Sequence, residues 1–225
     1  MRQTWRRLTF LHWPYPPNLI RRLVPASLQL DTFDNSAWIS LVPFEIFGTP
    51  GIPYFPETNL RTYVIGPGGS RAIWFFSLDA SRVAAVLGAR VGYHLPYFWA
   101  RMCVTPEGHA IHYQSQRHWP HDSAAMTAIV IEAGQPYASG ELGPRDHFLT
   151  ARYRLYTTFR GRLRYAQIEH PPWPLARANV IKLRETLTSA LGLPTPSAPP
   201  LIHYSEQIVV KIGFPRETRT PPDLH

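Results

Sequence analysis

Residues 55–64 read Phe-Pro-Glu-Thr-Asn-Leu-Arg-Thr-Tyr-Val, and this stretch decides the fold that we expect. Its aromatic and β-branched residues favour an extended strand, in which successive side chains point to opposite faces. The odd positions Glu57, Asn59, Arg61 and Tyr63 then form a polar stripe on one face, and the even positions are apolar residues and threonines. Such a stripe indicates either a paired polar network or the wall of a binding site.

The neighbouring stretches, residues 37–47 and 72–78, are apolar on both faces. Turn-forming residues at 34–36 and 66–69 lie between the apolar stretches and predict two hairpins. A polar face between such neighbours is expected to be at least partly buried, and its charges then need partners or water.

Other stretches rich in aromatic and β-branched residues predict strands at 98–105, 110–116, 126–132, 152–159, 163–168 and 201–212. A short helix is expected from Ser81 to Gly88. An amphipathic C-terminal helix is expected from Pro174 to Leu191, because Val180, Leu183, Leu187 and Leu191 recur at helical spacing. Many short strands with few helices predict an α+β fold, mostly β and built on antiparallel sheet. We expect a single domain over residues 5–212 and a loose C-terminal tail over residues 213–225.

Composition limits the cellular compartments and the classes of binding partner that we expect. The net charge is +8, but the arginines are spread along all 225 residues with no run longer than two, so we expect no nucleic-acid partner. A single cysteine, Cys103, excludes an intrachain disulfide, and its apolar surroundings predict a buried thiol in a reducing compartment. Neither a signal peptide nor an apolar run near the ~20 residues of a membrane span is present, so we expect a cytoplasmic protein without membrane contact.

Familiar catalytic motifs do not explain the stripe. Residues 68–72 lack the last glycine of a hydrolase elbow, and residues 66–69 lack the lysine of a phosphate loop. No metal or cofactor is expected. In the histidine-rich segment His109, His112, His118 and His121, strand geometry sends His109 and His112 to opposite faces, and no CxxC or HExxH motif accompanies them. His12 and His170 each adjoin a tryptophan, and each is either a base or a structural histidine.

Several blocks in order along the chain resemble one bacterial family. They include Phe10-Leu11-His12-Trp13, Phe55-x-Glu57-x-Asn59-x-Arg61-Thr62-Tyr63-Val64, Trp74-Phe75-Phe76-Ser77-Leu78-Asp79-Ala80, Tyr93-His94-Leu95-Pro96-Tyr97 and His170-x-Pro172-Trp173-Pro174-Leu175. On these blocks the chain resembles the YqjF-like proteins of domain-of-unknown-function family 2071, which are similar in fold to acetoacetate decarboxylase. The resemblance implies antiparallel sheets closing around a central pocket. By analogy with such folds, a homo-oligomer is also an expectation.

The chain departs from the decarboxylase at one decisive place. The decarboxylase uses a lysine, in a Pro-Lys-Lys stretch ahead of an alanine, to form a Schiff base with its ketone substrate. The stretch of this chain that resembles it is Leu95-Pro96-Tyr97-Phe98-Trp99-Ala100, with Tyr97 and Phe98 where the lysines would be. The two lysines of the chain, Lys182 and Lys211, fall on the predicted helix and the last strand. Since tyrosine cannot form an imine, Schiff-base decarboxylation is not expected.

Three functions remain open. The first is a small-molecule binding protein, in which Arg61, with Asn59 and Tyr63, holds a carboxylate or carbonyl ligand. The second is a lyase- or isomerase-type enzyme with Glu57 as acid or base and Tyr97 as a hydrogen-bond or proton donor. The third is a structural or interaction protein, in which Glu57 pairs with Arg61 or the stripe lies on an exposed face.

Overall fold

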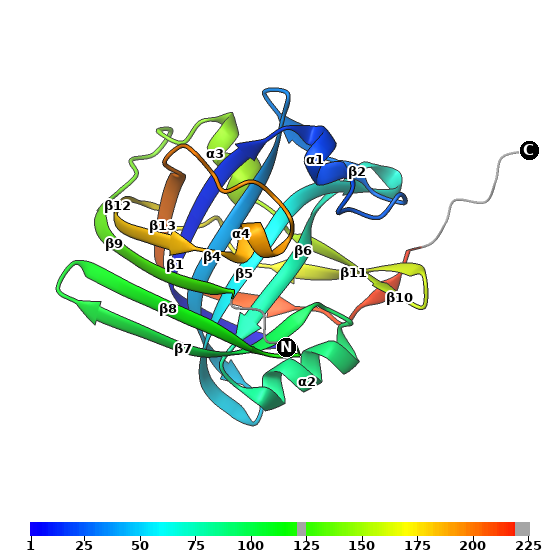
Figure 1. Cartoon of the computed structure of the whole chain (residues 1–225), viewed down its shortest axis with the longest axis horizontal. Coiled ribbons are helices and arrows are strands. Elements are labelled where there is room, and N and C mark those ends of the chain that lie inside the picture. Colours follow the sequence, from blue (N-terminus) through cyan, green and yellow to red (C-terminus); the bar gives the residue numbers. More distant parts are fainter. Residues whose placement is uncertain (121–124, 219–225) are drawn as a thin grey trace, which may run out of the picture.

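The computed structural model describes residues 1–120 and 125–218, and its strands join into one sheet (Figure 1). The strands are β1 (Arg2–Tyr15), β2 (Gln29–Leu30), β3 (Thr32–Phe33), β4 (Ser36–Thr49), β5 (Ile52–Gly66), β6 (Ser70–Ala80), β7 (Tyr97–Glu107), β8 (Ala110–Trp119), β9 (Met126–Pro136), β10 (Arg154–Phe159), β11 (Arg162–Glu169), β12 (Ala176–Glu185), β13 (Leu201–Ile212) and β14 (Arg216–Glu217). The helices are α1 (Pro17–Arg21), α2 (Val83–Gly92), α3 (Pro144–Thr150) and α4 (Leu187–Ala190), with a 3-10 turn, η1, at Pro67–Gly69. The predicted mostly-β fold class is confirmed. No helix in these ranges is long and apolar enough to cross a membrane.

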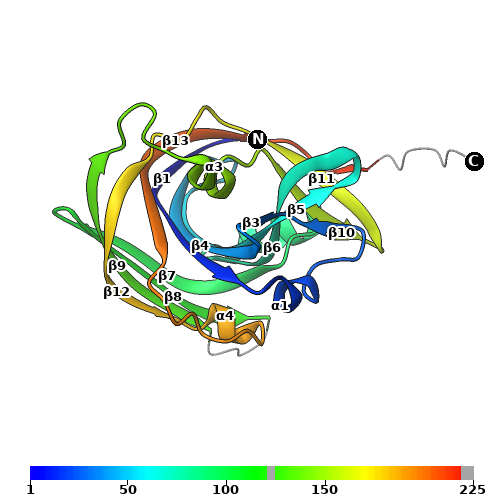
Figure 2. The ribbon, with the colours of Figure 1, turned by 90° about the horizontal axis from the view of Figure 1, so that it is seen from above.

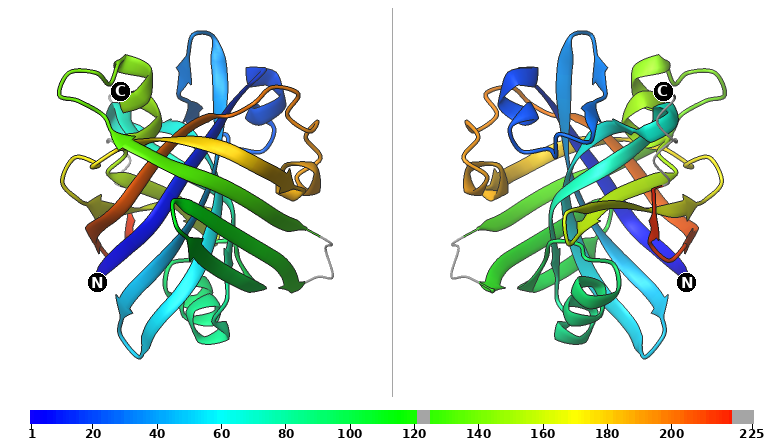
Figure 3. Two further views of the ribbon diagram at one scale, coloured as in Figure 1. Left: turned by 90° about the vertical axis from the view of Figure 1, so that its left-hand side faces the viewer. Right: turned by 90° about the vertical axis from the view of Figure 1, so that its right-hand side faces the viewer.

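Five strands, in the order β13-β1-β4-β5-β6, make a central sheet. The run β7-β8-β9-β12 connects β6 to β13 by one route, and the pair β10-β11 connects the same two strands by another. Two closed circuits of paired strands therefore share the central sheet as a common wall. Figure 2 shows the strands curving around the interior, and Figure 3 places α2 at one end of the molecule and α1 and α3 at the other.

The alternation of β5 divides the core between these two circuits. Leu60 and Val64 belong to a cluster that includes Ile111 of β8. Tyr63 belongs to a second cluster, which includes Leu155 of β10. The polar stripe therefore faces the side of the central sheet that β10, β11 and α3 cover.

Both predicted hairpins are present. β3 pairs with β4 across the turn at residues 34–35, and β5 pairs with β6 across η1. The predicted last strand, Leu201–Ile212, is β13, which pairs with β1 along most of its length.

The predicted C-terminal helix at Pro174–Leu191 is wrong. Residues Ala176–Glu185 form β12, which pairs with β9, and only the four residues of α4 are helical. The error has a physical cause, because β12 contains a β-bulge between Val180 and Lys182. The extra residue of a bulge lets Val180 and Leu183 both pack against the core, and their spacing of three then resembles helical periodicity.

Two further expectations concern the surface. Cys103 is exposed, contrary to prediction, because β7 pairs with β6 only through Tyr97–Trp99 and its later residues have β8 alone as a neighbour.

Within the predicted tail, β14 pairs with β11. Residues 219–225 of that tail, and His121 of the histidine-rich segment, lie outside the described residues.

The close approach of β5 and β10 generates a prediction. A Cβ atom at Gly66 would lie 2.2 Å from Cζ of Tyr156, so Gly66→Ala should lower the free energy of unfolding by about 1–3 kcal/mol through overpacking. Urea denaturation measures the change. Gly92→Ala is the control, because nothing lies within 4 Å of its added methyl group. Equal stability of the two variants would contradict the prediction.

Candidate functional site

All four residues of the polar stripe are buried. Glu57 and Asn59 are each 3% exposed, Arg61 is 6% exposed and Tyr63 is fully buried. The expected burial is therefore confirmed, and the environments of these side chains decide what each can do.

Strand pairing brings Tyr97 to the stripe. Asn59 of β5 pairs with Leu78 of β6, and Leu78 pairs in turn with Tyr97 at the start of the parallel strand β7. Residues opposite each other in a sheet share a face, so Tyr97 and Asn59 lie in one cross-strand row. The Tyr97 hydroxyl donates a hydrogen bond of 2.8 Å to Oε2 of Glu57, the adjacent member of the stripe. The structure therefore joins the two residues that the sequence proposed as catalytic.

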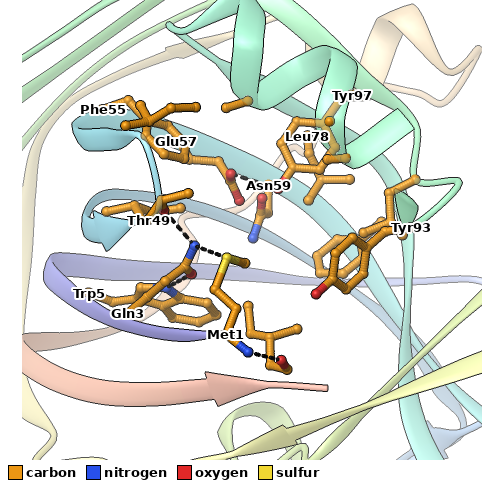
Figure 4. A pocket seen from close by; sticks show the side chains of 18 of the residues that line it. Met1, Gln3, Trp5, Thr49, Phe55, Glu57, Asn59, Leu78, Tyr93 and Tyr97 are labelled. Carbon is orange, nitrogen blue, oxygen red and sulfur yellow. Dashed lines mark hydrogen bonds between the residues drawn. The ribbon is translucent and has the colours of Figure 1, made fainter. Parts of the chain in front are cut away.

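A cavity of about 250 Å³ lies beside this pair (Figure 4). In Figure 4, Glu57 and Asn59 point into it from one side, and Gln3 and Trp5 lie opposite. Small residues of α2 line another part of the wall, among them Ala85. Most of the remaining lining is apolar, and it includes Trp5, Phe55, Phe75, Leu78, Leu95, Leu155 and Ile168. The cavity is thus an apolar space with a few polar groups, as small-molecule sites usually are.

Burial controls the charge of Glu57. Desolvation raises the pKa of Glu57 to about 8; the hydrogen bond from Tyr97 and the nearby Asn59 oppose this shift, and the charge of Asp79 adds to it. Burial, and then the charge of Glu57, raise the pKa of Tyr97 well above its usual value. At neutral pH the pair is therefore a neutral carboxylic acid and a neutral phenol. Such a carboxyl group can donate a proton to a ligand oxygen.

Arg61 does not line the cavity and does not pair with Glu57. Its guanidinium carbon lies 5.3 Å from the centre of the Phe10 ring, and its Nε and Nη2 atoms have no hydrogen-bond partner in the protein. None of the ion pairs among the described residues includes Arg61. Burial lowers the pKa of Arg61, but a guanidinium stays charged in proteins. The alternative of a Glu57–Arg61 ion pair on the sheet is therefore wrong.

Tyr63 and His170 make hydrogen bonds and ring contacts to other parts of the protein. The Tyr63 hydroxyl donates a hydrogen bond of 2.7 Å to the carbonyl of Leu149 and does not reach the cavity. His170 hydrogen-bonds the carbonyl of Pro171 through Nδ1, and its ring lies against Tyr153 and Trp173. Tyr63 thus supports the wall behind the site, although its position in the stripe predicted ligand contact.

Sequence reasoning missed one histidine. His203 of β13 is fully buried, and its Nε2 atom lies 3.0 Å from Oδ1 of Asp146 in α3. Its position beside Ser205 on the buried face of the predicted last strand was a weak local signal, and no motif marks it. His12, which the sequence left as base or structural residue, is also fully buried, and its ring centre lies 5.4 Å from that of His203.

Neither lysine of the chain can replace the missing nucleophile. Lys182 of β12 and Lys211 of β13 are both exposed, and neither lines the cavity beside Glu57. No lysine amine therefore lines this cavity, and the amine of Met1, which is also a lining residue, donates a hydrogen bond to the Ile212 carbonyl.

Comparison with known proteins supports the resemblance drawn from the sequence. Residues 2–209 match the family DUF2071, described as an uncharacterized conserved protein. The uncharacterized protein YqjF of Bacillus subtilis (strain 168) is 44% identical over 215 residues, which cover 92% of this chain and 88% of that protein.

Solved structures show the same fold at low identity. The enduracididine biosynthesis enzyme MppR complexed with pyruvate has a TM-score of 0.65 at 10% identity, covering 96% of this chain and 89% of that one. Acetoacetate decarboxylase from Legionella pneumophila has a TM-score of 0.63 at 10% identity, covering 97% and 87% of the two chains. At such identities the likeness establishes the acetoacetate decarboxylase-like fold and nothing about chemistry.

The pKa of Glu57 predicts a pH-dependent stability. Because the folded-state value of about 8 exceeds the ordinary value of 4.5, the folded protein holds an extra proton between these values. Stability from this group is therefore present below pH 4.5 and is lost as the pH rises toward 8. Glu57→Gln removes the effect, so at pH 9 the variant should exceed the wild type in unfolding free energy by at least ~1.4 kcal/mol, the equivalent of one pKa unit.

Urea denaturation at pH 5 and pH 9 measures this difference for the wild type and for Glu57→Gln. Glu132→Gln, at an exposed carboxylate on β9, is the matched control and should leave the pH dependence unchanged. Parallel pH profiles for the wild type and Glu57→Gln would mean that Glu57 is ionised in the folded protein at neutral pH.

Proposed function

Because this chain belongs to the DUF2071 family and has an acetoacetate decarboxylase-like fold, we propose that it binds a small carbonyl or carboxyl compound in the cavity beside Glu57, without forming an imine. The observation that carries this proposal is the buried Glu57–Tyr97 pair at the wall of an apolar cavity.

The chemistry of the cavity favours a ligand with an apolar body and one polar end. Apolar walls gain free energy by covering hydrocarbon, at roughly 25 cal/mol per Å² of buried apolar surface. The protonated carboxyl of Glu57 can donate to a carbonyl or carboxylate oxygen. The cavity volume of about 250 Å³ lies below the ~300–1,000 Å³ that is typical of drug-sized sites, so a small metabolite fits better than a large cofactor.

The structural neighbours support this class of ligand. One of them, the enzyme MppR, is complexed with pyruvate, a small compound with both a carbonyl and a carboxylate. In this chain we expect only non-covalent contacts with such a ligand, because Tyr97 stands in the corresponding stretch and cannot form an imine. Cytoplasmic location and a homo-oligomeric state stay predictions.

A second candidate function is acid/base catalysis of the lyase or isomerase type. The observation that favours it is the pKa of Glu57, which at about 8 lies close to neutral pH, where a group can both accept and release a proton. Glu57 would then remove or return a proton next to a substrate carbonyl, and the Tyr97 hydroxyl would keep the carboxyl group oriented through its hydrogen bond.

Blocking the cavity tests binding. We expect hexanoate and 2-hexanone to bind the wild type and to lose at least tenfold in affinity in Ala85→Leu, whose larger side chain fills the space beside α2. Leu87→Ala changes the exposed face of the same helix and should bind normally. Isothermal titration calorimetry measures the affinities, and native mass spectrometry of the freshly purified wild type detects a co-purified ligand. Absence of binding, or equal binding by Ala85→Leu, would contradict the proposal.

Deuterium exchange separates binding from turnover. In deuterated buffer, we expect no exchange at the carbon atoms beside the carbonyl of 2-hexanone above the uncatalysed rate, with the wild type or with Glu57→Gln. Binding of 2-hexanone should persist in Glu57→Gln, because the amide can still donate to the carbonyl. Exchange that the wild type accelerates and Glu57→Gln abolishes would instead establish the acid/base function. Nuclear magnetic resonance follows the exchange.

A further inference from the structure

Among the described residues that line the cavity beside Glu57, none has a cationic side chain. The ionisable side chains in the wall are those of Glu57, Tyr93 and Tyr97. The amine of Met1 donates a hydrogen bond to the Ile212 carbonyl, and Figure 4 shows this amine apart from Glu57. The wall therefore offers an anionic ligand no side chain of opposite charge.

The arginines nearest to the site lie outside the cavity. The ring of Phe10 lies 5.3 Å from the guanidinium carbon of Arg61, which is not a lining residue. Arg117 of β8 forms a buried ion pair with Asp79 of β6, with 2.6 Å between Nη2 and Oδ1. Arg90 of α2 donates a hydrogen bond of 2.7 Å to a backbone carbonyl of β7 and lines a different cavity. None of these guanidinium groups is part of the wall beside Glu57.

Glu57 shows how this environment affects a carboxyl group. Burial raises its pKa to about 8, although the hydrogen bond from Tyr97 favours the ionised form. The nearby charge that shifts this pKa is that of Asp79, which is negative and raises it further. A carboxylate that enters the same space loses its hydration as Glu57 does, and it meets no compensating cation. The cavity therefore disfavours negative charge on a ligand.

The polar end of the ligand decides between a carboxylate and a neutral carbonyl group. A carboxylate can accept the proton of Glu57, but the pair then still holds one negative charge in an apolar space. A neutral carbonyl oxygen accepts the same hydrogen bond and brings no net charge. The apolar wall, which includes Phe55, Leu78 and Leu155, contacts the alkyl chain equally in both cases.

From the lining residues and their charges we infer that this cavity binds neutral carbonyl compounds with a short alkyl chain, such as ketones and amides, in preference to carboxylates of the same shape. Glu57 donates to the carbonyl oxygen, and Tyr97 orients the carboxyl group of Glu57. The inference rests on the proposed function, because it narrows the ligand class of the same site. It also distinguishes this chain from MppR, which is complexed with a carboxylate, pyruvate.

Three compounds of similar shape test the preference. Hexanoate, hexanamide and 2-heptanone share a five-carbon alkyl chain on a carbonyl carbon and differ in the group that completes it: an oxygen anion, an amide nitrogen or a methyl group. At pH 7, isothermal titration calorimetry should show that the wild type binds both neutral compounds at least tenfold more tightly than hexanoate. Ala85→Leu should weaken both neutral compounds at least tenfold, and Leu87→Ala, at an exposed residue of the same helix, should not.

The proton of the ligand itself allows a second measurement on the wild type. An aliphatic carboxylic acid titrates near the ~4.3 of a glutamic acid side chain, so lowering the pH from 7 to 5 raises the neutral fraction of hexanoate roughly eightyfold. The apparent affinity for hexanoate should therefore rise at least tenfold, while that for hexanamide stays constant. Glu57, with a pKa of about 8, stays largely protonated over this range, and burial raises the pKa values of Tyr93 and Tyr97.

Equal or tighter binding of hexanoate at pH 7, or a hexanoate affinity that does not change between pH 7 and pH 5, would overturn the inference. The proposed function survives such a result if hexanoate binds and Ala85→Leu blocks it. If none of the three compounds binds the wild type, the proposed function fails as well. Acetylation of the Met1 amine should leave the preference unchanged. A preference seen only after acetylation would show that this amine binds the carboxylate, contrary to the inference.

Discussion

The register of β4 against β5 is the constraint on which the rest of the site depends. The two strands pair without a shift from Thr49 opposite Ile52 to Ile39 opposite Thr62. Side chains alternate with a period of two, so a slip of one residue would turn Glu57 and Arg61 toward the apolar cluster that Leu60 now fills. The apolar face of β5 holds the register, and the register holds the polar stripe inside the molecule.

Burying polar side chains raises the free energy of the folded state, and the structure offsets this differently for Glu57 and for Arg61. Glu57 is buried without a cation, and its carboxyl group is neutral at neutral pH with Tyr97 as hydrogen-bond donor. Arg61 cannot be neutralised, and the face of the Phe10 ring stabilises its charge only in part. Buried polar groups without hydrogen-bond partners are typical of binding and catalytic sites. At such sites, function takes precedence over the usual requirement that every buried polar group be paired.

The comparison with acetoacetate decarboxylase distinguishes the shared fold from the chemistry of the site. The chain has the same fold at 10% identity, and the parallel pairing of β6 with β7 places Tyr97 against Glu57. A single fold commonly supports different chemistries through the side chains that it brings into one site. Here the fold places a carboxyl group beside a cavity, while both lysines of the chain lie exposed on other strands.

The sequence alone determined the features that local periodicity and composition encode. Alternation revealed the stripe, turn residues located the hairpins, Leu201–Ile212 was identified as a strand, and Tyr97 in place of a lysine excluded an imine there. Only the tertiary structure decided that Glu57 accepts a hydrogen bond from Tyr97 and that Nε and Nη2 of Arg61 are buried without partners. It also decided that a bulge makes 176–185 a strand. The physical reason is that these outcomes depend on which distant strands pair, and in which register, and no local pattern in the chain carries that information.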